Sequence, residues 1–153
     1  MNISFIGGGV MAEAIIGGIL GANIASHENI RVGEPSEKRQ AHLAETYGID
    51  IHSRNQEVVD NADIIVLSVK PQSLSEVMAD IKPALKSNQA VLSIVAGAKT
   101  ETLSTGLDHA SIIRVMPNTP AQIGAGMTVW TALPAVTKDT ITTSRNILST
   151  LGE

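Results

Sequence analysis

The chain has 153 residues, of which 43% are hydrophobic and 17% charged, proportions typical of a globular domain rather than a disordered segment. Its net charge of −4 gives no electrostatic attraction to nucleic acid or anionic membranes, and the absence of cysteine excludes disulfides, thiolate catalysis and cysteine metal sites. The first cationic side chain is Arg31, so the N-terminus lacks the basic segment of a signal peptide, and no long apolar run predicts a transmembrane helix. We therefore expect a cytoplasmic protein with neither a membrane nor a nucleic-acid partner.

The beginning of the chain predicts a strand, a tight turn and a helix in immediate succession. Residues 3–6 are mostly apolar and suit a strand, Gly7, Gly8 and Gly9 suit the turn, and residues 11–20 suit a helix. In such a unit, glycines let the backbone approach a pyrophosphate, and the helix N-terminus offers free N–H groups. The pattern predicts a dinucleotide-binding turn, and the alternative is a glycine-rich turn that serves only helix packing.

The next part of the chain repeats this alternation. A short strand over residues 30–32 precedes a helix that Ser36 caps and Gly48 ends. A weak strand over 49–52 follows, and Asn55 is the expected N-cap of a short helix that reaches residue 59.

The second half of the chain continues the pattern with two strongly apolar strands. The strand expected over residues 63–69 has a continuous apolar run that predicts burial on both faces, as in a parallel sheet. The remaining expected elements are a helix over 74–85 that Pro83 ends or distorts, a strand over 90–95, a short helix from Glu101, strands over 111–116 and 126–130, and a helix over 139–151. This alternation predicts an α/β fold of the Rossmann type, a single domain over 1–153 with a doubly wound, mostly parallel sheet.

The carboxyl ends of the expected strands share one composition. Small residues and prolines dominate these ends, which are Gly7–Gly9, Gly33–Ser36, Ser68–Pro71, Val95–Gly97 and Met116–Thr119. Ligands of open α/β sheets bind at this edge, where such residues let the backbone press against a flat ring or a sugar. Ordinary loops also favour glycine and proline, but the glycine motif at the first strand favours a cofactor-binding edge.

The end of the second strand bears on which dinucleotide binds. Glu34 lies 25 residues past Gly9, where a carboxylate accepts hydrogen bonds from the adenosine ribose and repels a 2′-phosphate. Ser36, Lys38 and Arg39 follow and could hold that phosphate, or the two cations could be solvated residues of a helix. These residues do not decide whether the cofactor is NADP or NAD.

Other chemistries have little support in the sequence. The four histidines have no metal-ligand spacing, and we expect each on the surface or in a loop. Neither a G-x-S-x-G elbow nor a P-loop is present, and no general acid–base pair is evident. Lys70 follows a buried strand and could contact phosphate or ribose, or could only cap the sheet edge.

Four segments in order resemble the pyrroline-5-carboxylate reductases. They are Ile6–Gly18, Ala62–Gln72, Ser93–Gly97 and Arg114–Thr128. The resemblance implies an enzyme of proline biosynthesis, an oxidoreductase that reduces the small molecule 1-pyrroline-5-carboxylate to L-proline with hydride from NADPH or NADH. Because the cofactor carries the chemistry, we expect no catalytic side chain and no metal ligand in this chain.

The resemblance also implies how the dinucleotide lies along the sheet edge. The turn Ile6, Gly7, Gly8, Gly9, Val10 and Met11 would hold the pyrophosphate, Glu34 and Ser36 the adenosine ribose with Arg39 beside them, and Asn55 the adenine end. Ser68, Val69 and Lys70, with Pro71 next to them, would flank ribose and phosphate, Val95, Ala96 and Gly97 the nicotinamide half, and Pro117 and Asn118 the reaction chamber.

Two departures from the family pattern qualify these expectations. Many NADPH-using members carry Asn-Arg where this chain has Glu34-Pro35. Members also continue past the position of Glu153 into a helical C-terminal domain that dimerises and supplies most of the substrate site. We therefore expect this chain to bind dinucleotide weakly and to turn over little substrate alone, and the full-length protein to be a homo-oligomer.

Two alternative functions remain at this stage. One is an NAD(P)-sensing module that binds the dinucleotide without catalysis. The other is a short Rossmann oxidoreductase that resembles the F420-dependent NADP reductases, although the sequence shows no sign of a flavin-like pocket.

Overall fold

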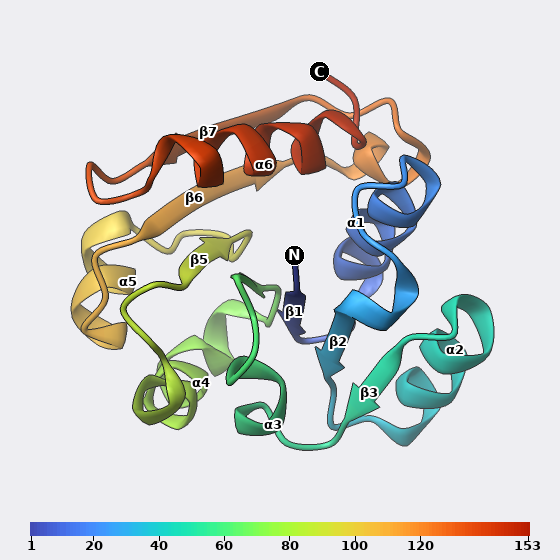
Figure 1. The fold of residues 1–153 in the computed structure, drawn as a ribbon, viewed down its shortest axis with the longest axis horizontal. Coiled ribbons are helices and arrows are strands. Elements are labelled where there is room, and N and C mark those ends of the chain that lie inside the picture. Colours follow the sequence, from blue (N-terminus) through green and yellow to red (C-terminus); the bar gives the residue numbers. More distant parts are fainter.

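The computed structural model describes residues 1–153, which form one seven-stranded sheet with helices on both faces (Figure 1). The strands are β1 (Ile3–Ile6), β2 (Ile30–Gly33), β3 (Asp50–His52), β4 (Ile64–Leu67), β5 (Ala90–Ser93), β6 (Ile112–Pro117) and β7 (Thr128–Ala132). The α-helices are α1 (Val10–Gly21), α2 (Glu37–Tyr47), α3 (Gln56–Val59), α4 (Leu74–Ile81), α5 (Thr100–Leu107) and α6 (Lys138–Ser149). Short 3-10 turns are η1 (His27–Asn29), η2 (Pro71–Ser73), η3 (Lys82–Ala84) and η4 (Thr119–Ile123).

The strand order is β3-β2-β1-β4-β5-β6-β7, with all neighbours parallel except β6 and β7. The order reverses direction beside β1, which pairs with β2 on one side and with β4 on the other. Ile6 is in register with Gly33 and with Leu67, so these three strands end at the same level. A crevice at such a reversal point is where open α/β sheets bind ligands. The predicted doubly wound, mostly parallel sheet is confirmed.

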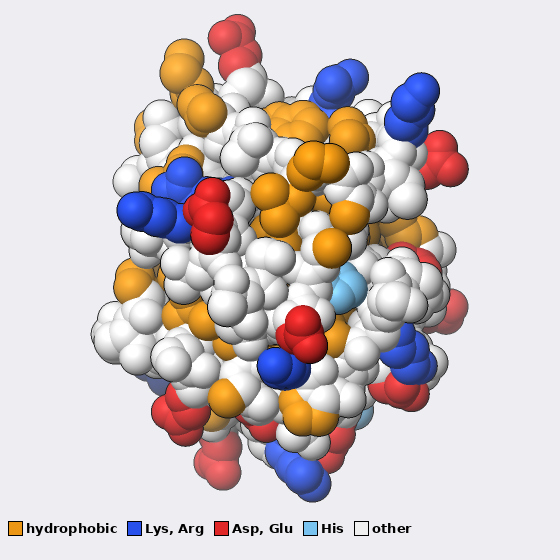
Figure 2. Space-filling model, turned by 90° about the vertical axis from the view of Figure 1, so that its left-hand side faces the viewer, with side chains coloured by type: hydrophobic (Ala, Val, Ile, Leu, Met, Phe, Trp, Pro, Cys, Tyr) orange, Lys and Arg blue, Asp and Glu red, His pale blue; other side chains and the backbone are white.

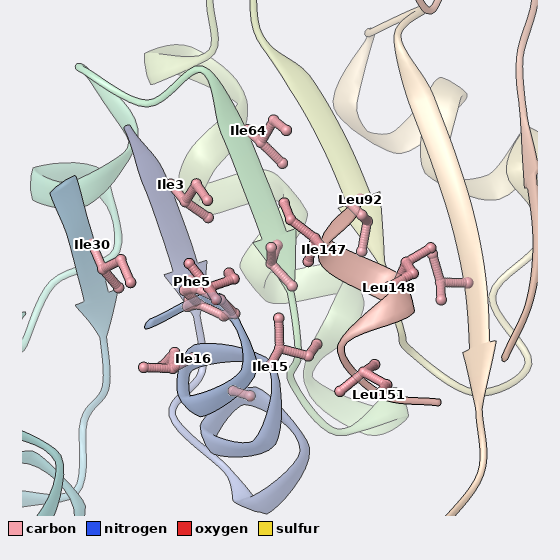
Figure 3. Close-up of a cluster of buried hydrophobic side chains, with 14 of the residues drawn as sticks. Ile3, Phe5, Ile15, Ile16, Ile30, Ile64, Leu92, Ile147, Leu148 and Leu151 are labelled. Atoms are coloured by element: carbon pink, nitrogen blue, oxygen red, sulfur yellow. The ribbon is translucent and has the colours of Figure 1, made fainter. Parts of the chain in front are cut away.

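One face of the sheet is covered by α1, α2 and α6. Ile3 and Phe5 of β1 point to this face, where Ile15 of α1 and Ile147 of α6 pack against them (Figure 3). All four side chains are fully buried. The core is aliphatic apart from Phe5, and burial of such side chains is the main stabilising contribution to the fold.

The opposite face is covered by α3, α4 and α5. Ile6 and Leu67 point to this face and pack with Met78 of α4 and Leu103 of α5. Consecutive residues of the parallel strands thus enter different cores, which explains why these strands read as continuous apolar runs. Figure 2 views the molecule from the side of α5, where hydrophobic side chains gather on one part of the surface and charged side chains surround it.

Several local signals act as the sequence predicts. The Ser36 hydroxyl accepts a hydrogen bond from the Arg39 N–H at 3.5 Å, and Gly48 ends α2 with a φ of 64°. Helix α4 ends at Ile81, and Pro83 lies in the 3-10 turn that follows it. The caps and the proline therefore set the helix ends as expected.

Other local expectations need correction or more detail. The strand expected over 63–69 is shorter and spans Ile64–Leu67, and the chain bends at Val69. Asn55 precedes α3 but makes no cap bond, since its side-chain amide donates to the Asp80 carboxylate at 3.2 Å. His109 lies in a loop, as expected, and is only 9% exposed, and its Nε2 bonds the Gln89 carbonyl at 2.7 Å.

The sheet edge at β7 is partly covered by the last residues of the chain. Gly126 and Gly152 form a parallel bridge, and the Thr128 N–H donates to the Glu153 carbonyl at 2.7 Å. The observed β7 begins two residues later than the strand expected from residue 126. None of the helices combines the length and the apolar character that a membrane-spanning segment requires.

Candidate functional site

A cleft of about 480 Å³ opens at the carboxyl ends of β1, β2 and β4, beside the start of α4. It brings together many of the residues that the sequence predicts for cofactor binding. Its lining consists of Gly7, Gly9, Gly33, Glu34, Pro35, Asn55, Ser68, Val69, Lys70, Ser73, Glu76 and Val77. The cleft therefore lies at the reversal point of the strand order, as expected for a ligand site of this fold.

The turn between β1 and α1 requires glycine at its first position. Gly7 has a φ of 95°, and a Cβ on it would lie 2.8 Å from the Ser68 carbonyl oxygen. The Ser68 hydroxyl also donates to the carbonyls of Ile6, at 3.1 Å, and Gly7, at 2.7 Å. These contacts hold the turn tightly against the end of β4.

Gly9 differs from Gly7 because packing does not require it. A Cβ on Gly9 would meet no atom within 4 Å, and its φ of −71° suits any residue. Gly9 is the N-cap of α1, and no side chain caps this helix. The first-turn N–H groups of α1 thus begin beside open space at the cleft, which is the arrangement that binds phosphate groups.

Glu34 does not project freely into the cleft. Its side chain accepts hydrogen bonds from the Gly8 N–H, at 2.7 Å, and the Ser36 N–H, at 2.8 Å. The residue is only 8% exposed. A carboxylate at the end of β2 therefore links the glycine turn to the loop that precedes α2.

Arg39 bonds to the carbonyl of the same residue, Gly8. Its Nε and Nη2 donate to the Gly8 carbonyl at 2.8 and 2.6 Å, and Nη2 also lies 2.8 Å from a carboxylate oxygen of Glu13. Arg39 reaches from α2 to the glycine turn, and it is not among the residues that line the cleft. Arg39 thus serves the loop itself in this structure.

Glu13 is the centre of a small polar cluster behind the turn. Its second carboxylate oxygen lies 2.7 Å from His42 Nε2 and accepts from the Tyr47 hydroxyl at 3.3 Å. Burial raises the pKa of Glu13, but the hydrogen bonds from His42 and Arg39 outweigh it and the pKa lies below its ordinary value. Burial and the Glu13 charge raise the pKa of Tyr47. Glu13 therefore stays ionised and keeps Arg39 in place.

The other predicted residues lie outside the cleft. Ile6 and Val95 are buried and offer only backbone, whereas Val10 is exposed and Met11 half-buried at the start of α1. Pro71 follows Lys70 in η2 and is exposed. Further along the same sheet edge, the structure places Ala96 and Gly97 after β5, and Pro117 and Asn118 at the end of β6. The Asn118 side chain accepts from the Met127 N–H at 2.9 Å.

The sequence-based site lacks several residues that line the cleft. Gly33 and Pro35 flank Glu34 and were recognisable from their place at a strand end. Ser73, Glu76 and Val77 come from η2 and the first turns of α4, and only their position just after the Lys70-Pro71 segment pointed to them. A helix start beside a strand end is thus the signal that could have found them.

Comparison with known proteins agrees with this geometry. The sheet order and the glycine turn define a Rossmann-like α/β domain. The chain belongs to the family described as "NADP oxidoreductase coenzyme F420-dependent", whose model matches residues 2–97.

The chain is also similar to pyrroline-5-carboxylate reductases over nearly its whole length. It is 38% identical to that of Synechocystis over 152 residues and 39% identical to that of Escherichia coli K12 over 153 residues, covering 99% of this chain in both cases. The chain spans 57% of the length of both relatives. The resemblance predicted from the four sequence motifs is confirmed.

Solved structures give the same result. A pyrroline-5-carboxylate reductase from Coxiella burnetii superposes with a TM-score of 0.93 at 35% identity, over 99% of this chain and 56% of that one. The Plasmodium falciparum pyrroline carboxylate reductase, a structure with NADP bound, superposes with a TM-score of 0.85 at 30% identity, over 99% and 55%. A prephenate dehydrogenase from Aquifex aeolicus, at 11% identity and a TM-score of 0.80, shares the fold alone.

Proposed function

We propose that this chain is the dinucleotide-binding part of a pyrroline-5-carboxylate reductase, which reduces the C=N bond of 1-pyrroline-5-carboxylate to give L-proline. The similarity to reductases of this name over 99% of the chain supports the reaction. The cleft at the glycine turn supports NADPH or NADH as the hydride source. In this proposal, residues 1–153 form one NAD(P)-binding domain.

The observation that carries the proposal is the open space in front of Gly9. A turn that served only helix packing would have a neighbour at each of its glycines, as Gly7 and Gly8 have. Gly9 has none, although it stands at the uncapped start of a twelve-residue helix. The N–H groups of Gly9 and Val10 fit a pyrophosphate, which needs close approach and free donors. Those of Gly7 and Gly8 already donate to the Gly33 carbonyl, at 2.8 Å, and to Glu34, at 2.7 Å.

The other parts of the dinucleotide are placed relative to this pyrophosphate site. Asn55 and Val69 line the same cleft, where the adenosine half belongs, and Ser68 and Lys70 flank its ribose and phosphate. We place the nicotinamide half along the ends of β5 and β6, against Ala96, Gly97 and Pro117. When bound, the reduced nicotinamide supplies a hydride to the imine carbon. A protonated imine is already electrophilic, so the task of these residues is orientation rather than proton transfer.

The substrate and the assembly belong to the whole protein. The relatives that match are nearly twice as long as the matched part, and we propose that the residues beyond the matched region bind the pyrroline carboxylate and form a homo-oligomer. We place the protein in the cytoplasm. The 153-residue chain alone then binds dinucleotide but turns over little substrate.

The other two functions have less support. The family description names coenzyme F420, but that match ends at residue 97 and leaves out β6, η4 and β7. The relatives that cover those elements as well are pyrroline-5-carboxylate reductases. A sensing module would bind the dinucleotide equally well, so an assay of the longer protein must separate it from the enzyme.

A pair of matched variants tests the binding site. Gly9→Val places two methyl groups in front of the first turn of α1, whereas Gly21→Val places them in equally open space at the other end of the helix. Titration of NADH and NADPH fluorescence should show binding to the wild type and to Gly21→Val, and at least about tenfold weaker binding to Gly9→Val. Equal binding by both variants would contradict the proposed site.

Turnover is tested separately with a protein extended to the length of its relatives. Oxidation of NADH or NADPH that depends on added 1-pyrroline-5-carboxylate should be measurable there. Binding without such oxidation would favour the sensing module over the reductase.

A further inference from the structure

The charged side chains that line the cleft are mostly acidic. Glu34 and Glu76 both contribute to the lining, and Lys70 is the cation that accompanies them. Arg39, the residue best suited to grip a phosphate in a bidentate manner, does not line the cleft. A ligand at the end of β2 therefore meets a carboxylate before it meets a guanidinium.

Glu34 is held where it is. Both of its oxygens accept backbone N–H groups, from Gly8 at 2.7 Å and Ser36 at 2.8 Å, and the residue is 8% exposed. A rotation of this side chain away from an incoming phosphate would leave both N–H groups without their partner, which is unfavourable above all for the buried Gly8 N–H. The carboxylate is thus a fixed feature of the site.

Arg39 is committed elsewhere. It donates through Nε and Nη2 to the Gly8 carbonyl and pairs with Glu13 at 2.8 Å. Recruiting its guanidinium to a phosphate in the cleft would break the grip on the glycine turn and separate it from an ionised partner. Lys38 is exposed on the first turn of α2, and no ion pair fixes it near the cleft.

We propose that Glu34 makes the site select NADH over NADPH, by presenting a fixed carboxylate where the 2′-phosphate of NADPH would lie while Arg39 is kept on the glycine turn. The inference rests on the proposed dinucleotide site. An adenosine ribose with free hydroxyl groups can donate hydrogen bonds to a carboxylate, whereas a phosphate there is repelled by like charge.

The test compares four titrations of the wild-type chain. NADH and NADPH are titrated by fluorescence, and 5′-ADP and adenosine 2′,5′-bisphosphate are used as competitors that carry only the adenosine half. We expect NADH to bind at least about tenfold more tightly than NADPH, because the carboxylate repels the 2′-phosphate by like charge. Added salt should narrow this ratio by screening the repulsion.

Variants assign the selectivity to its residue. Glu34→Gln removes the charge with little change in shape and should narrow the NADH-to-NADPH ratio at least about fivefold. Glu37→Gln removes an exposed carboxylate three residues away and should leave the ratio unchanged. Thermal melting confirms that each variant is folded, and the salt series on the wild type needs no variant.

The outcomes are distinct. Equal or tighter binding of NADPH by the wild type overturns the inference, and so does an NADH preference that Glu34→Gln leaves intact in a folded protein. Failure of the folded wild type to bind either dinucleotide overturns the proposed function and the inference with it.

Discussion

The two halves of the carboxyl sheet edge are built differently. Around the glycine turn, side chains of Glu34, Arg39 and Ser68 bond to the backbone of a neighbouring loop at 2.6–3.1 Å. At the ends of β5 and β6, the comparable contacts are those of Ser93 with the Val95 N–H, at 3.3 Å, and of Asn118. The first half is cross-linked within the chain, and the second half is open.

Exposed apolar side chains reinforce this difference. Met116, Ile123, Met127 and Val129 are 38–83% exposed, and all four belong to β6, η4, β7 and their connection. Exposed apolar side chains mark an interaction surface where they form a contiguous patch, whereas single ones are ordinary. Contacts within the chain thus fix the first half of the edge, whereas the second half carries more exposed apolar side chains.

The largest expected effect concerns what stabilises the open half. Ile113 of β6 is fully buried under α6, and Ile113→Ala should lower the free energy of unfolding by about 2–4 kcal/mol. Val129 on the adjacent β7 is 68% exposed, and Val129→Ala should change the free energy of unfolding by less than about 0.5 kcal/mol. Urea denaturation of both variants measures the contrast. Similar losses would mean that the exposed side of β7 also supports the fold.

The next effect concerns ligand binding in the two halves. Gly7→Ala places a Cβ at 2.8 Å from the Ser68 carbonyl at a φ of 95°, so binding of 5′-ADP should weaken at least about tenfold. Gly97 also has a positive φ, of 75°, but faces open space. Gly97→Ala should leave 5′-ADP binding within about twofold, as measured by calorimetry. Loss of binding in both variants would remove the distinction between the halves.

A smaller effect should follow from loosening the cross-linked half. Arg39→Lys keeps the charge but replaces a fork of donors by one ammonium group, which cannot hold Gly8 and Glu13 in the same geometry. We expect a loss of about 1 kcal/mol in stability and weaker NADH binding. Lys38→Ala, at the exposed neighbouring position, is the control in both thermal melting and titration. An unchanged Arg39→Lys variant would mean that the grip on Gly8 is dispensable.

The smallest effect is a pH dependence at β3, the far edge of the cross-linked half. The hydrogen bond to Asp50 raises the pKa of His52, burial opposes this, and the bond to Glu57 adds to it. A raised pKa stabilises the fold fully below the unfolded-state pKa, about 6.5, and this stabilisation is lost as the pH rises through the folded-state pKa.

Denaturation of the wild type and His52→Gln between about pH 5.5 and 8 tests this sign. The wild type should be more stable by less than about 1 kcal/mol at the acidic end, and the two should converge toward the basic end. A difference that grew with pH would contradict the assignment.

The fold was largely predictable because its signals are local. The cap at Ser36, the stop at Gly48 and the break at Pro83 act over a few residues, and the buried strands show as apolar runs. Features that local signals did not reveal come from contacts between distant residues. Asn55 bonds Asp80, 25 residues away, and His109 bonds Gln89, 20 residues away, so neither a missing cap nor a buried histidine could be inferred from neighbours alone.

The candidate site shows the same limit. Its position followed from the strand ends, and the cleft contains the predicted Gly7, Gly9, Asn55 and Lys70. The direction of the Glu34 side chain did not follow from the strand ends, because its hydrogen-bond partner Gly8 lies 26 residues earlier in the chain. A strand-end rule places a carboxylate near a ribose, but the packing of β1 against β2 determines what that carboxylate bonds first.

The bridge between Gly126 and Gly152 has a consequence for how the purified chain behaves. Strand edges template the addition of further strands, and here the carbonyl of Glu153 and the N–H of Thr128 already satisfy each other at the start of β7. The remainder of β7, like the outer side of β3, offers unpaired backbone to another molecule. Disruption of the Gly126–Gly152 contact should therefore lengthen the free edge at β7 and make concentrated solutions more prone to association by strand pairing.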